Sequence, residues 1–278
     1  NRIITLYFHN DPLSMDGSKS IEDRKKLLKN CYKIIFNSIW SKKRFLDGLE
    51  NKFVNSNKLL VFYQSAAKAN ESILSKKKNW ITFVGKLNKA KGYDVFAKSI
   101  KKILIKHPQW TAKIIGDEKR EKILLNHPNA HVLGFKNHND VINIFKKTSI
   151  AVACSRWEEP FGRTSLEASA NGCAVIITNK GGLPETVTNA KIINELTEKN
   201  LTIKINELIK KKLLRKKLQR LSIKNFYLTH AFVTKQIDNY RKEKLFKRVF
   251  SINAIKKSLR ILHVTNFNER LDGRLFFN

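Results

Sequence analysis

Cysteine is scarce in this sequence, and long apolar runs are absent from it. Only Cys31, Cys154 and Cys173 occur among the 278 residues, an odd number with no C-x-x-C spacing, so no disulfide framework is predicted. The last two lie inside apolar runs, where we expect them to pack as small core residues in a reducing compartment. No run approaches the roughly 20 apolar residues of a membrane-spanning helix. We therefore expect a cytoplasmic globular protein.

Acidic residues are also few: 23 Asp and Glu stand against 55 Lys and Arg, a formal charge of +32. One explanation is a polyanionic partner, such as nucleic acid, an anionic membrane surface or a phosphorylated substrate. The other is the joint over-use of Lys, Asn, Ile and Phe that an AT-rich genome imposes. The lysines are scattered and no nucleic-acid-binding motif is present. We therefore expect no nucleic-acid partner.

The densest basic run is KKKLLRKKLQR, from Lys210 to Arg220. As a helix it would carry an apolar stripe and a basic face; the stripe would consist of Leu213, Leu214, Leu218 and Leu221. A basic face of this kind is usually just solvated. The alternative is peripheral contact with the anionic inner face of a membrane.

Short apolar runs alternate with amphipathic segments along the chain. The strand-like runs are residues 3–8, 33–37, 59–63, 80–85, 111–116, 130–134, 149–154 and 173–178. One helical segment between them has Phe96, Ile100, Ile103 and Leu104 on a single face and ends before Pro108. Alternation of strand and helix predicts an α/β fold with a doubly wound, Rossmann-like parallel sheet covered on both faces.

The chain is predicted to contain two α/β domains. The polar segment 64–79 has no periodic apolar stripe, so we place a junction near residue 70. Residues 1–70 would be the C-terminal part of one domain and 71–224 a complete second domain. We expect a closing helix over 225–247, and the strand-like residues after 258 read as the truncated start of a further module. This organisation suggests a fragment of a longer protein.

Two glutamates flank a tight turn in SRWEEPFGRTSLEASANGCAVI. Glu159 falls in the loop after strand 149–154, and Glu167 in the first turn of the helix that follows. In parallel sheets such loops bind ligands, and the helix N-terminus favours phosphate. Two plainer interpretations remain open. Thr164 and Glu167 have the spacing of a capping box, and Glu159 would be an ordinary surface carboxylate.

A second candidate loop, GKLNKAKG, directly follows strand 80–85. Gly85 ends the strand, and Lys86 and Lys91 bracket the turn. Two cations on a strand-to-helix loop suit a diphosphate. The loop has neither the Walker A pattern nor the G-x-G-x-x-G pattern. Because lysine is abundant throughout the chain, the pair alone is weak evidence.

Taken in order, GKLNKAKG, KIIGDE, HVLGF, the two-glutamate segment and GGLPETV resemble the nucleotide-sugar half of a GT-B glycosyltransferase. The similarity is to glycosyltransferase family 4, of retaining enzymes, and covers roughly residues 80–245. Glu159 and Glu167 match the E-x7-E signature of that family. The upstream segment SIWSKKRFLDG is similar to the end of the family's N-terminal domain, which binds the acceptor, and 225–246 to the helix that crosses back to it.

This resemblance implies a role for each candidate residue. Lys86 and Lys91, after Gly85, would hold the donor diphosphate, and the amides of Arg163 and Thr164 after Gly162 would meet the phosphate. Glu167 would accept hydrogen bonds from the ribose hydroxyls. Glu159, with the backbone of Phe161 and Gly162, would hold the transferred sugar. His9, in YFHNDP, would lie near that sugar, although a hydrogen-bonded histidine at a strand end is the plainer interpretation.

The sequence departs from the family pattern at two places. Lys86 stands where the pattern has Arg, which keeps the charge but loses a bidentate grip on phosphate. The A-x-G-x-P pattern lacks its proline, because Ala174 occupies that position. Most of the N-terminal domain, including its glycine-rich loop, is missing. We therefore expect the chain alone to bind a nucleotide, and both sugar transfer and binding without transfer stay open. The final residues are similar to the opening strand of another such domain, which suggests a tandem parent.

The resemblance therefore predicts transfer of a sugar from a nucleoside-diphosphate sugar to an acceptor hydroxyl with retention of configuration. The acceptor would be a saccharide or a lipid-linked saccharide in polysaccharide biosynthesis. We expect no cofactor and no metal site, since no D-x-D motif is present and cations would neutralise the phosphates instead. Two alternatives are a nucleotide-binding but inactive domain and a basic nucleic-acid-binding protein. A related sugar phosphorylase would need a pyridoxal-binding lysine in a context that the sequence lacks.

Overall fold

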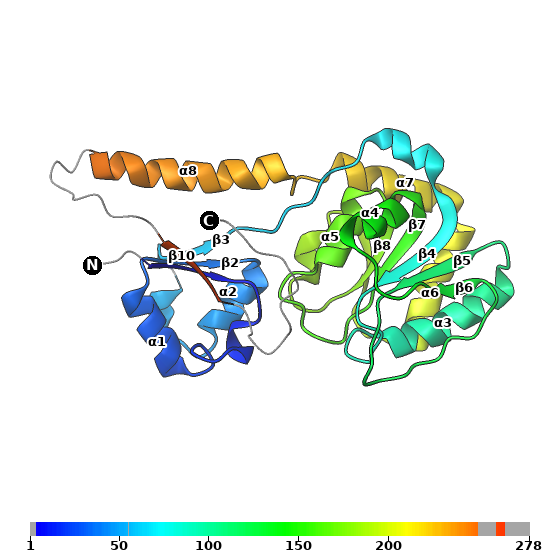
Figure 1. Cartoon of the computed structure of the whole chain (residues 1–278), viewed down its shortest axis with the longest axis horizontal. Coiled ribbons are helices and arrows are strands. Elements are labelled where there is room, and N and C mark those ends of the chain that lie inside the picture. Colours follow the sequence, from blue (N-terminus) through cyan, green and yellow to red (C-terminus); the bar gives the residue numbers. More distant parts are fainter. Residues whose placement is uncertain (1–3, 55, 250–259, 265–278) are drawn as a thin grey trace. The chain divides into compact units, whose positions relative to one another are not determined.

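The computed structural model describes residues 4–54, 56–249 and 260–264. The chain divides into two compact units, residues 1–63 with 239–278 and residues 64–238. The first boundary thus falls at Tyr63, a few residues before the predicted junction. The second falls inside the long helix α8 (His230–Val249), which corresponds to the predicted closing helix (Figure 1). No helix in the described part of the chain is long and apolar enough to cross a bilayer.

The first unit is built on a four-stranded parallel sheet in the order β10-β1-β2-β3. Its elements are β1 (Ile4–Phe8), η1 (Pro12–Ser14), α1 (Ile21–Asn30), β2 (Lys33–Phe36), α2 (Ile39–Leu46), η2 (Asn51–Phe53), β3 (Leu59–Val61) and β10 (Arg260–Val264). Ser20 and Ser38 cap the two α-helices by accepting hydrogen bonds from backbone amides. The core is aromatic: the ring of Phe36 lies 5.5 Å from Phe8 and 5.2 Å from Phe45.

Strand β10 lies in the segment that was predicted to begin a further module. The apolar residues after 258 do form a strand, but it pairs with β1 in register from Ile4 opposite Arg260 to Phe8 opposite Val264. In this structure it is therefore the outermost strand of the first sheet, and the prediction of a further module stays a prediction. Residues 265–278, which the same prediction included, lie outside the described residues.

The second unit holds a six-stranded parallel sheet in the order β6-β5-β4-β7-β8-β9. Its strands are β4 (Lys78–Val84), β5 (Thr111–Ile115), β6 (Ala130–Val132), β7 (Thr148–Ala153), β8 (Ala174–Thr178) and β9 (Ala190–Ile193). Its helices are η3 (Glu71–Lys76), α3 (Tyr93–Lys106), α4 (His138–Lys147), α5 (Arg163–Ala170), η4 (Leu183–Thr186), α6 (Glu198–Lys210) and α7 (Lys212–Lys224). The predicted doubly wound α/β fold is confirmed, and all eight predicted strands are present.

Helices cover both faces of this sheet, as Figure 1 shows for α3 and α6 on one side and α4 and α5 on the other. Alternate residues of a strand point to opposite faces, so Ile150 and Val152 pack with α3 and α6 while Ala151 packs with α4. Both faces of β7 are therefore buried, which explains the apolar run from Ile150 to Ala153.

The strand order places a topological switch point between β4 and β7. From β4 the chain moves outward to β5 and β6, and then returns to β7 on the other side of β4. The loops that follow these two strands diverge to opposite faces of the sheet. At this point a doubly wound sheet leaves room for a ligand beyond the carboxyl ends of its strands.

Candidate functional site

Both predicted loops lie at the switch point, because β4 and β7 are neighbours and parallel, with Phe83 opposite Val152. The carbonyl oxygen of Ala90, in the first loop, accepts hydrogen bonds from the amides of Arg156 and Trp157 at 2.9 and 3.0 Å. The Ser155 hydroxyl donates to the same oxygen at 3.2 Å. Hydrogen bonds to this one carbonyl oxygen thus join the two loops, and side-chain identities alone could not have predicted them.

Asn88 shapes the first loop, and the sequence analysis did not single it out. Its side-chain oxygen accepts from the amide of Lys91 at 3.0 Å, and its side-chain nitrogen donates to Glu118 at 3.0 Å. Glu118 also bonds the amide and side chain of Arg120, and these hydrogen bonds lower the pKa of its carboxyl to about 2. Asn88 therefore fixes the turn that carries Lys91 and ties it to the loop after β5.

Lys91 and Glu159, one from each loop, form an ion pair. The Nζ atom of Lys91 lies 2.5 Å from Oε1 of Glu159, and the two side chains are 32% and 15% exposed. Glu159 is therefore not an isolated surface carboxylate. A cation and a carboxylate, both partly accessible, meet at the carboxyl ends of the two central strands.

The segment GGLPE holds the backbone of Glu159 in place. The amide of Gly182 donates to the carbonyl oxygen of Glu159 at 2.6 Å. A Cβ atom at Gly181 would lie 2.1 Å from that oxygen, so only glycine permits this approach. The neighbouring Glu158 accepts from Nζ of Lys180 at 3.2 Å and from the amide of Gly181. The Gly-Gly pair was the sequence signal for this contact.

The helix α5 begins at the end of the second loop, with Gly162 as its N-cap at φ 107°. No side chain caps this end, so the amides of Arg163 and Thr164 have no partner within the helix. Phe161 is buried at 2% exposure and anchors the turn that precedes the helix. The arrangement is one that favours an anion, because the helix dipole is positive here.

Glu167 is buried in the second turn of α5, and its contacts show that the capping-box interpretation is wrong. The helix starts at Gly162, so Thr164 is not the cap. Oε1 of Glu167 accepts from Nη2 of Arg163 at 2.8 Å and lies 3.7 Å from Nδ1 of His138. Arg163, predicted to meet a ligand through its amide, thus also orients Glu167 through its side chain.

His138 was not identified from the sequence. It is the first residue of α4, after the N-cap Asn137, whose side chain accepts from the amide of Asp140. The imidazole is 55% exposed beside the buried carboxylate of Glu167. A histidine one position after an N-cap asparagine carried no signal, because the approach of α4 to α5 depends on the tertiary fold.

Gly85 and Lys86 occupy the first positions of the loop after β4. The amide of Gly85 donates to the carbonyl oxygen of Ile115 at 3.0 Å, which joins this loop to the end of β5. The side chain of Lys86 is exposed. The structure therefore places both predicted cations, Lys86 and Lys91, in one loop at the carboxyl edge of the sheet.

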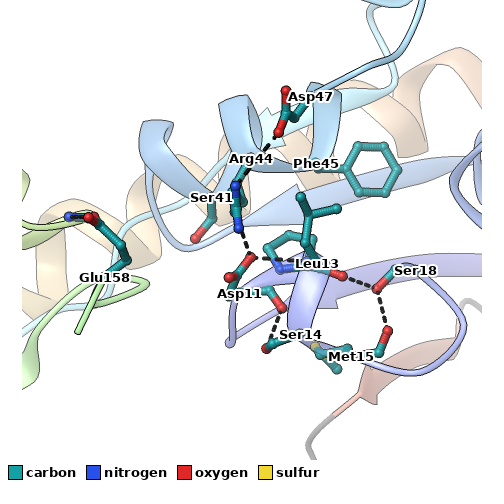
Figure 2. Close-up of polar contacts among 12 residues, drawn as sticks. Asp11, Leu13, Ser14, Met15, Ser18, Ser41, Arg44, Phe45, Asp47 and Glu158 are labelled. Atoms are coloured by element: carbon teal, nitrogen blue, oxygen red, sulfur yellow. Dashed lines mark hydrogen bonds and ion pairs between the residues drawn. The ribbon is translucent and has the colours of Figure 1, made fainter. Parts of the chain in front are cut away.

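His9 belongs to the first unit, where it follows β1. Its carbonyl oxygen accepts from Nδ2 of Asn37 at 2.8 Å, and its ring lies 4.3 Å from that of Tyr7. Figure 2 shows the loop that continues from it, in which the Asp11 carboxylate accepts from the amide of Leu13 at 3.0 Å and pairs with Nε of Arg44 at 3.4 Å. The loop after β1 is thus pinned to α2, and the catalytic role of His9 stays a prediction.

The comparison with known proteins identifies the family. The family model described as glycosyl transferases group 1 matches residues 65–225, which is more than half of the chain and contains both loops. The chain belongs to the glycosyl transferases group 1 family. The expected GT-B fold and the expected resemblance to this family are confirmed.

Two curated relatives and one solved structure illustrate the similarity. Spore coat protein SA of Bacillus subtilis is 29% identical over 149 residues, 48% of this chain and 40% of that protein. An uncharacterized 41.2 kDa protein in the cps region of Klebsiella pneumoniae is 30% identical over 167 residues, 58% and 40% of the two chains. HepE of Anabaena, crystallised with UDP and glucose, has a TM-score of 0.70 at 18% identity and covers 87% of this chain and 72% of its own.

The extent of these matches bounds what they imply. The chain spans 40% of the length of the two curated relatives. The likeness to HepE concerns the GT-B fold, which the group 1 glycosyltransferase family and this chain share.

Proposed function

We propose that this protein transfers a sugar from a nucleoside-diphosphate sugar to an acceptor hydroxyl. The observation that carries the proposal is the ion pair between Lys91 and Glu159 beside the N-terminus of α5. A donor of this class needs a cation for its diphosphate and a hydrogen-bond acceptor for its sugar hydroxyls. Both groups stand here at the switch point of a doubly wound sheet.

Different residues would bind different parts of the donor. The diphosphate would bind Lys86, Lys91 and the amides at the start of α5, which supply positive charge and N–H donors. Glu167 would accept hydrogen bonds from the ribose hydroxyls, held in position by Arg163. Glu159, released from Lys91 when the diphosphate arrives, would accept hydrogen bonds from the transferred sugar.

The reaction places opposite charges on the two halves of the donor. As the bond to the leaving oxygen breaks, positive charge grows on the sugar ring and negative charge on the diphosphate. Lys91 and the dipole of α5 would stabilise the negative charge, and fixed groups of this kind commonly contribute about 3–4 kcal/mol each. We propose that these groups act without a metal ion and that the acceptor attacks with retention of anomeric configuration.

Support for the nucleotide comes from the structural relatives, because HepE was crystallised with UDP and with UDP-glucose. We propose UDP as the first nucleotide to test. A saccharide acceptor, free or lipid-linked, agrees with relatives such as the lipopolysaccharide core mannosyltransferase LpsB of Rhizobium meliloti, which is 29% identical over 121 residues.

The decisive experiment is calorimetric titration of UDP, GDP and ADP into the chain and into Glu167→Ala. We expect one nucleotide to bind in the micromolar range and to bind at least tenfold more weakly to the variant. If the variant binds as tightly as the wild type, Glu167 has no role in the donor site. If none of the three nucleotides binds, the proposed function is wrong.

A second candidate function is nucleotide binding without transfer. It is favoured by Lys86, which replaces an arginine of the family pattern and grips a phosphate less firmly. Incubation with radiolabelled nucleotide sugar and saccharide acceptors separates the two candidates. A labelled product whose anomeric configuration matches the donor by NMR supports retaining transfer, and binding without any product supports the second candidate.

A further inference from the structure

Helix α7 lies in the longest stretch of the sequence that has no acidic residue. Residues 208–237 contain nine Lys and Arg and no Asp or Glu, whereas the whole chain has 23 acidic residues in 278. Over-use of lysine alone would not remove every carboxylate from 30 consecutive residues. The segment therefore carries charge of one sign across the whole of α7.

The contacts of the buried residues of α7 locate this helix, and therefore its charge, within the second unit. Three of its residues are spaced four apart and reach the amino ends of three strands. Arg215 lies over the ring of Trp110, which precedes β5, at 4.9 Å. Gln219 donates to the carbonyl oxygen of Ser149 in β7 at 3.0 Å, and Ile223 packs where Gly172 leads into β8. The helix thus runs along the amino edge of the sheet, opposite the donor site.

The outward face of α7 is cationic. Its exposed residues are Lys212, Leu213, Lys216, Lys217, Arg220 and Lys224. Within the described part of the chain, none of these five cations has a carboxylate within ion-pair distance. The nearby Lys211 differs, since it pairs with Glu207 at 3.6 Å. We refer to the six residues as the α7 face.

Leu213 distinguishes the α7 face from an ordinary solvated lysine surface. The other leucines of the predicted stripe are covered, and Leu214 and Leu218 pack against the core. Leu213 instead points outward and is 84% exposed. It is therefore one apolar side chain surrounded by cations, with no role in the core.

We propose that the α7 face docks on an anionic lipid membrane. The five cations would lie against the headgroups, each contributing about 1 kcal/mol by its attraction to anionic lipid, and Leu213 would reach the acyl boundary. Helix α7 contains no aromatic residue on which bases of a single-stranded nucleic acid would stack. Because the face lies at the amino edge, a docked chain keeps its donor site directed away from the lipid.

Flotation of the full chain with lipid vesicles tests this proposal. We expect it to float with vesicles that contain phosphatidylglycerol and not with pure phosphatidylcholine. Raising NaCl from about 0.1 M to about 1 M shortens the screening length from about 10 Å to about 3 Å and should abolish flotation. Absence of flotation with phosphatidylglycerol vesicles at low salt would overturn the proposal.

A pair of charge-reversed variants separates the α7 face from net charge. In K216E/K217E we expect the vesicle affinity to fall by at least about 25-fold, a factor of about five for each cation lost. The control is K98E/K101E, which makes the same change in net charge at two exposed positions of α3 and should retain most of the affinity. Equal losses in both variants would show that only net charge matters.

Unfolding of the variants and binding of nucleic acid are tested by two further measurements. Both double variants should bind UDP as the wild type does and melt at the same temperature, so a loss of flotation would not reflect unfolding or a damaged donor site. Competition with single-stranded and duplex nucleic acid tests the other polyanion. If either displaces the vesicles at equal phosphate concentration, the α7 face is a nucleic-acid surface and the proposal is wrong.

Discussion

A Cβ atom on Gly92 would lie 1.9 Å from the carbonyl oxygen of Cys154. The backbone at the start of α3 therefore lies directly against the backbone that follows β7, with Gly92 at φ 71° as the N-cap of the helix, and the Cys154 thiol also donates to the carbonyl oxygen of Gly92 at 3.5 Å. This contact holds together the two loops that carry Lys91 and Glu159. It also restricts what residue 92 can be.

Replacement of Gly92 by alanine should destabilise the protein by about 2–4 kcal/mol, because a clash with backbone adds to the strain of a left-handed residue. Urea unfolding measures the loss. Gly134→Ala is the matched control, since Gly134 has φ 66° but no atom within 4 Å of its Cβ position. Only the conformational cost of about 1 kcal/mol should appear there. Equal losses at both positions would show that the contact with Cys154 is not tight.

The ion pair between Lys91 and Glu159 leads us to predict that removal of the Glu159 charge strengthens nucleotide binding. In Glu159→Gln the ammonium of Lys91 is released and a negative charge leaves the site, so UDP itself should bind about 3–10 times more tightly. Sugar transfer should fall, because the acceptor for the sugar hydroxyls is weakened. Calorimetry and a transfer assay measure the two effects.

The control for this prediction is Glu158→Gln. The Glu158 carboxylate is the immediate neighbour but pairs with Lys180 rather than Lys91. This variant removes the same charge without releasing Lys91, so UDP affinity should change by less than in Glu159→Gln. If Glu159→Gln binds UDP more weakly than the wild type, Glu159 does not compete with the diphosphate for Lys91.

Much of the fold could be predicted from apolar runs, and the exceptions have physical causes. Strand β9 (Ala190–Ile193) was missed because it is a short edge strand with Ile192 45% exposed. The strand at 260–264 was recognised, but its partner was not. Pairing in a parallel sheet joins residues far apart in sequence, and here Ile4 lies opposite Arg260.

The loops of the candidate site could be predicted from the sequence, but the contacts between their residues could not. Lys91 and Glu159 were each identified, but their meeting depends on β4 and β7 being neighbours, which a strand's own sequence does not encode. The Thr164–Glu167 spacing fitted a capping box, yet the left-handed Gly162 starts α5 before Thr164. His138 reaches Glu167 from another helix. Such contacts arise from the tertiary structure.

Lys77 should be a stabilising residue rather than a functional one. Its buried ammonium donates to the carbonyl oxygens of Phe145 and Asn171, at the ends of α4 and α5, at 2.9 and 2.6 Å. Burial lowers the pKa of Lys77, which shows that desolvation opposes its charge. Lys77→Met would leave both oxygens without this donor and should cost about 1–3 kcal/mol of unfolding free energy.

The neighbouring Lys76 is exposed, and Lys76→Met provides the control for this loss. Its unfolding free energy should stay within about 0.5 kcal/mol of the wild type, as is usual for surface substitutions. If Lys77→Met is as stable as Lys76→Met, the two carbonyl oxygens do not depend on the ammonium of Lys77.

Cys154 should make the protein less stable in alkali. The thiol is fully buried, and burial raises its pKa from 9.0 to about 12. From pH 9 upward the unfolded chain therefore loses this proton while the folded chain keeps it. A thiol whose pKa is higher in the folded chain than in the unfolded chain contributes stability that is fully present below pH 9. This stability is lost as the pH rises toward 12, by about 1.4 kcal/mol per pH unit.

Urea unfolding at increasing pH should show that decline in the wild type, together with the declines from Cys31 and Cys173, whose pKa values burial also raises. Cys154→Ala should be less stable at neutral pH but should lose stability more slowly above pH 9. An unchanged alkaline slope in the variant would mean that the Cys154 thiol ionises in the folded protein as readily as in the unfolded chain.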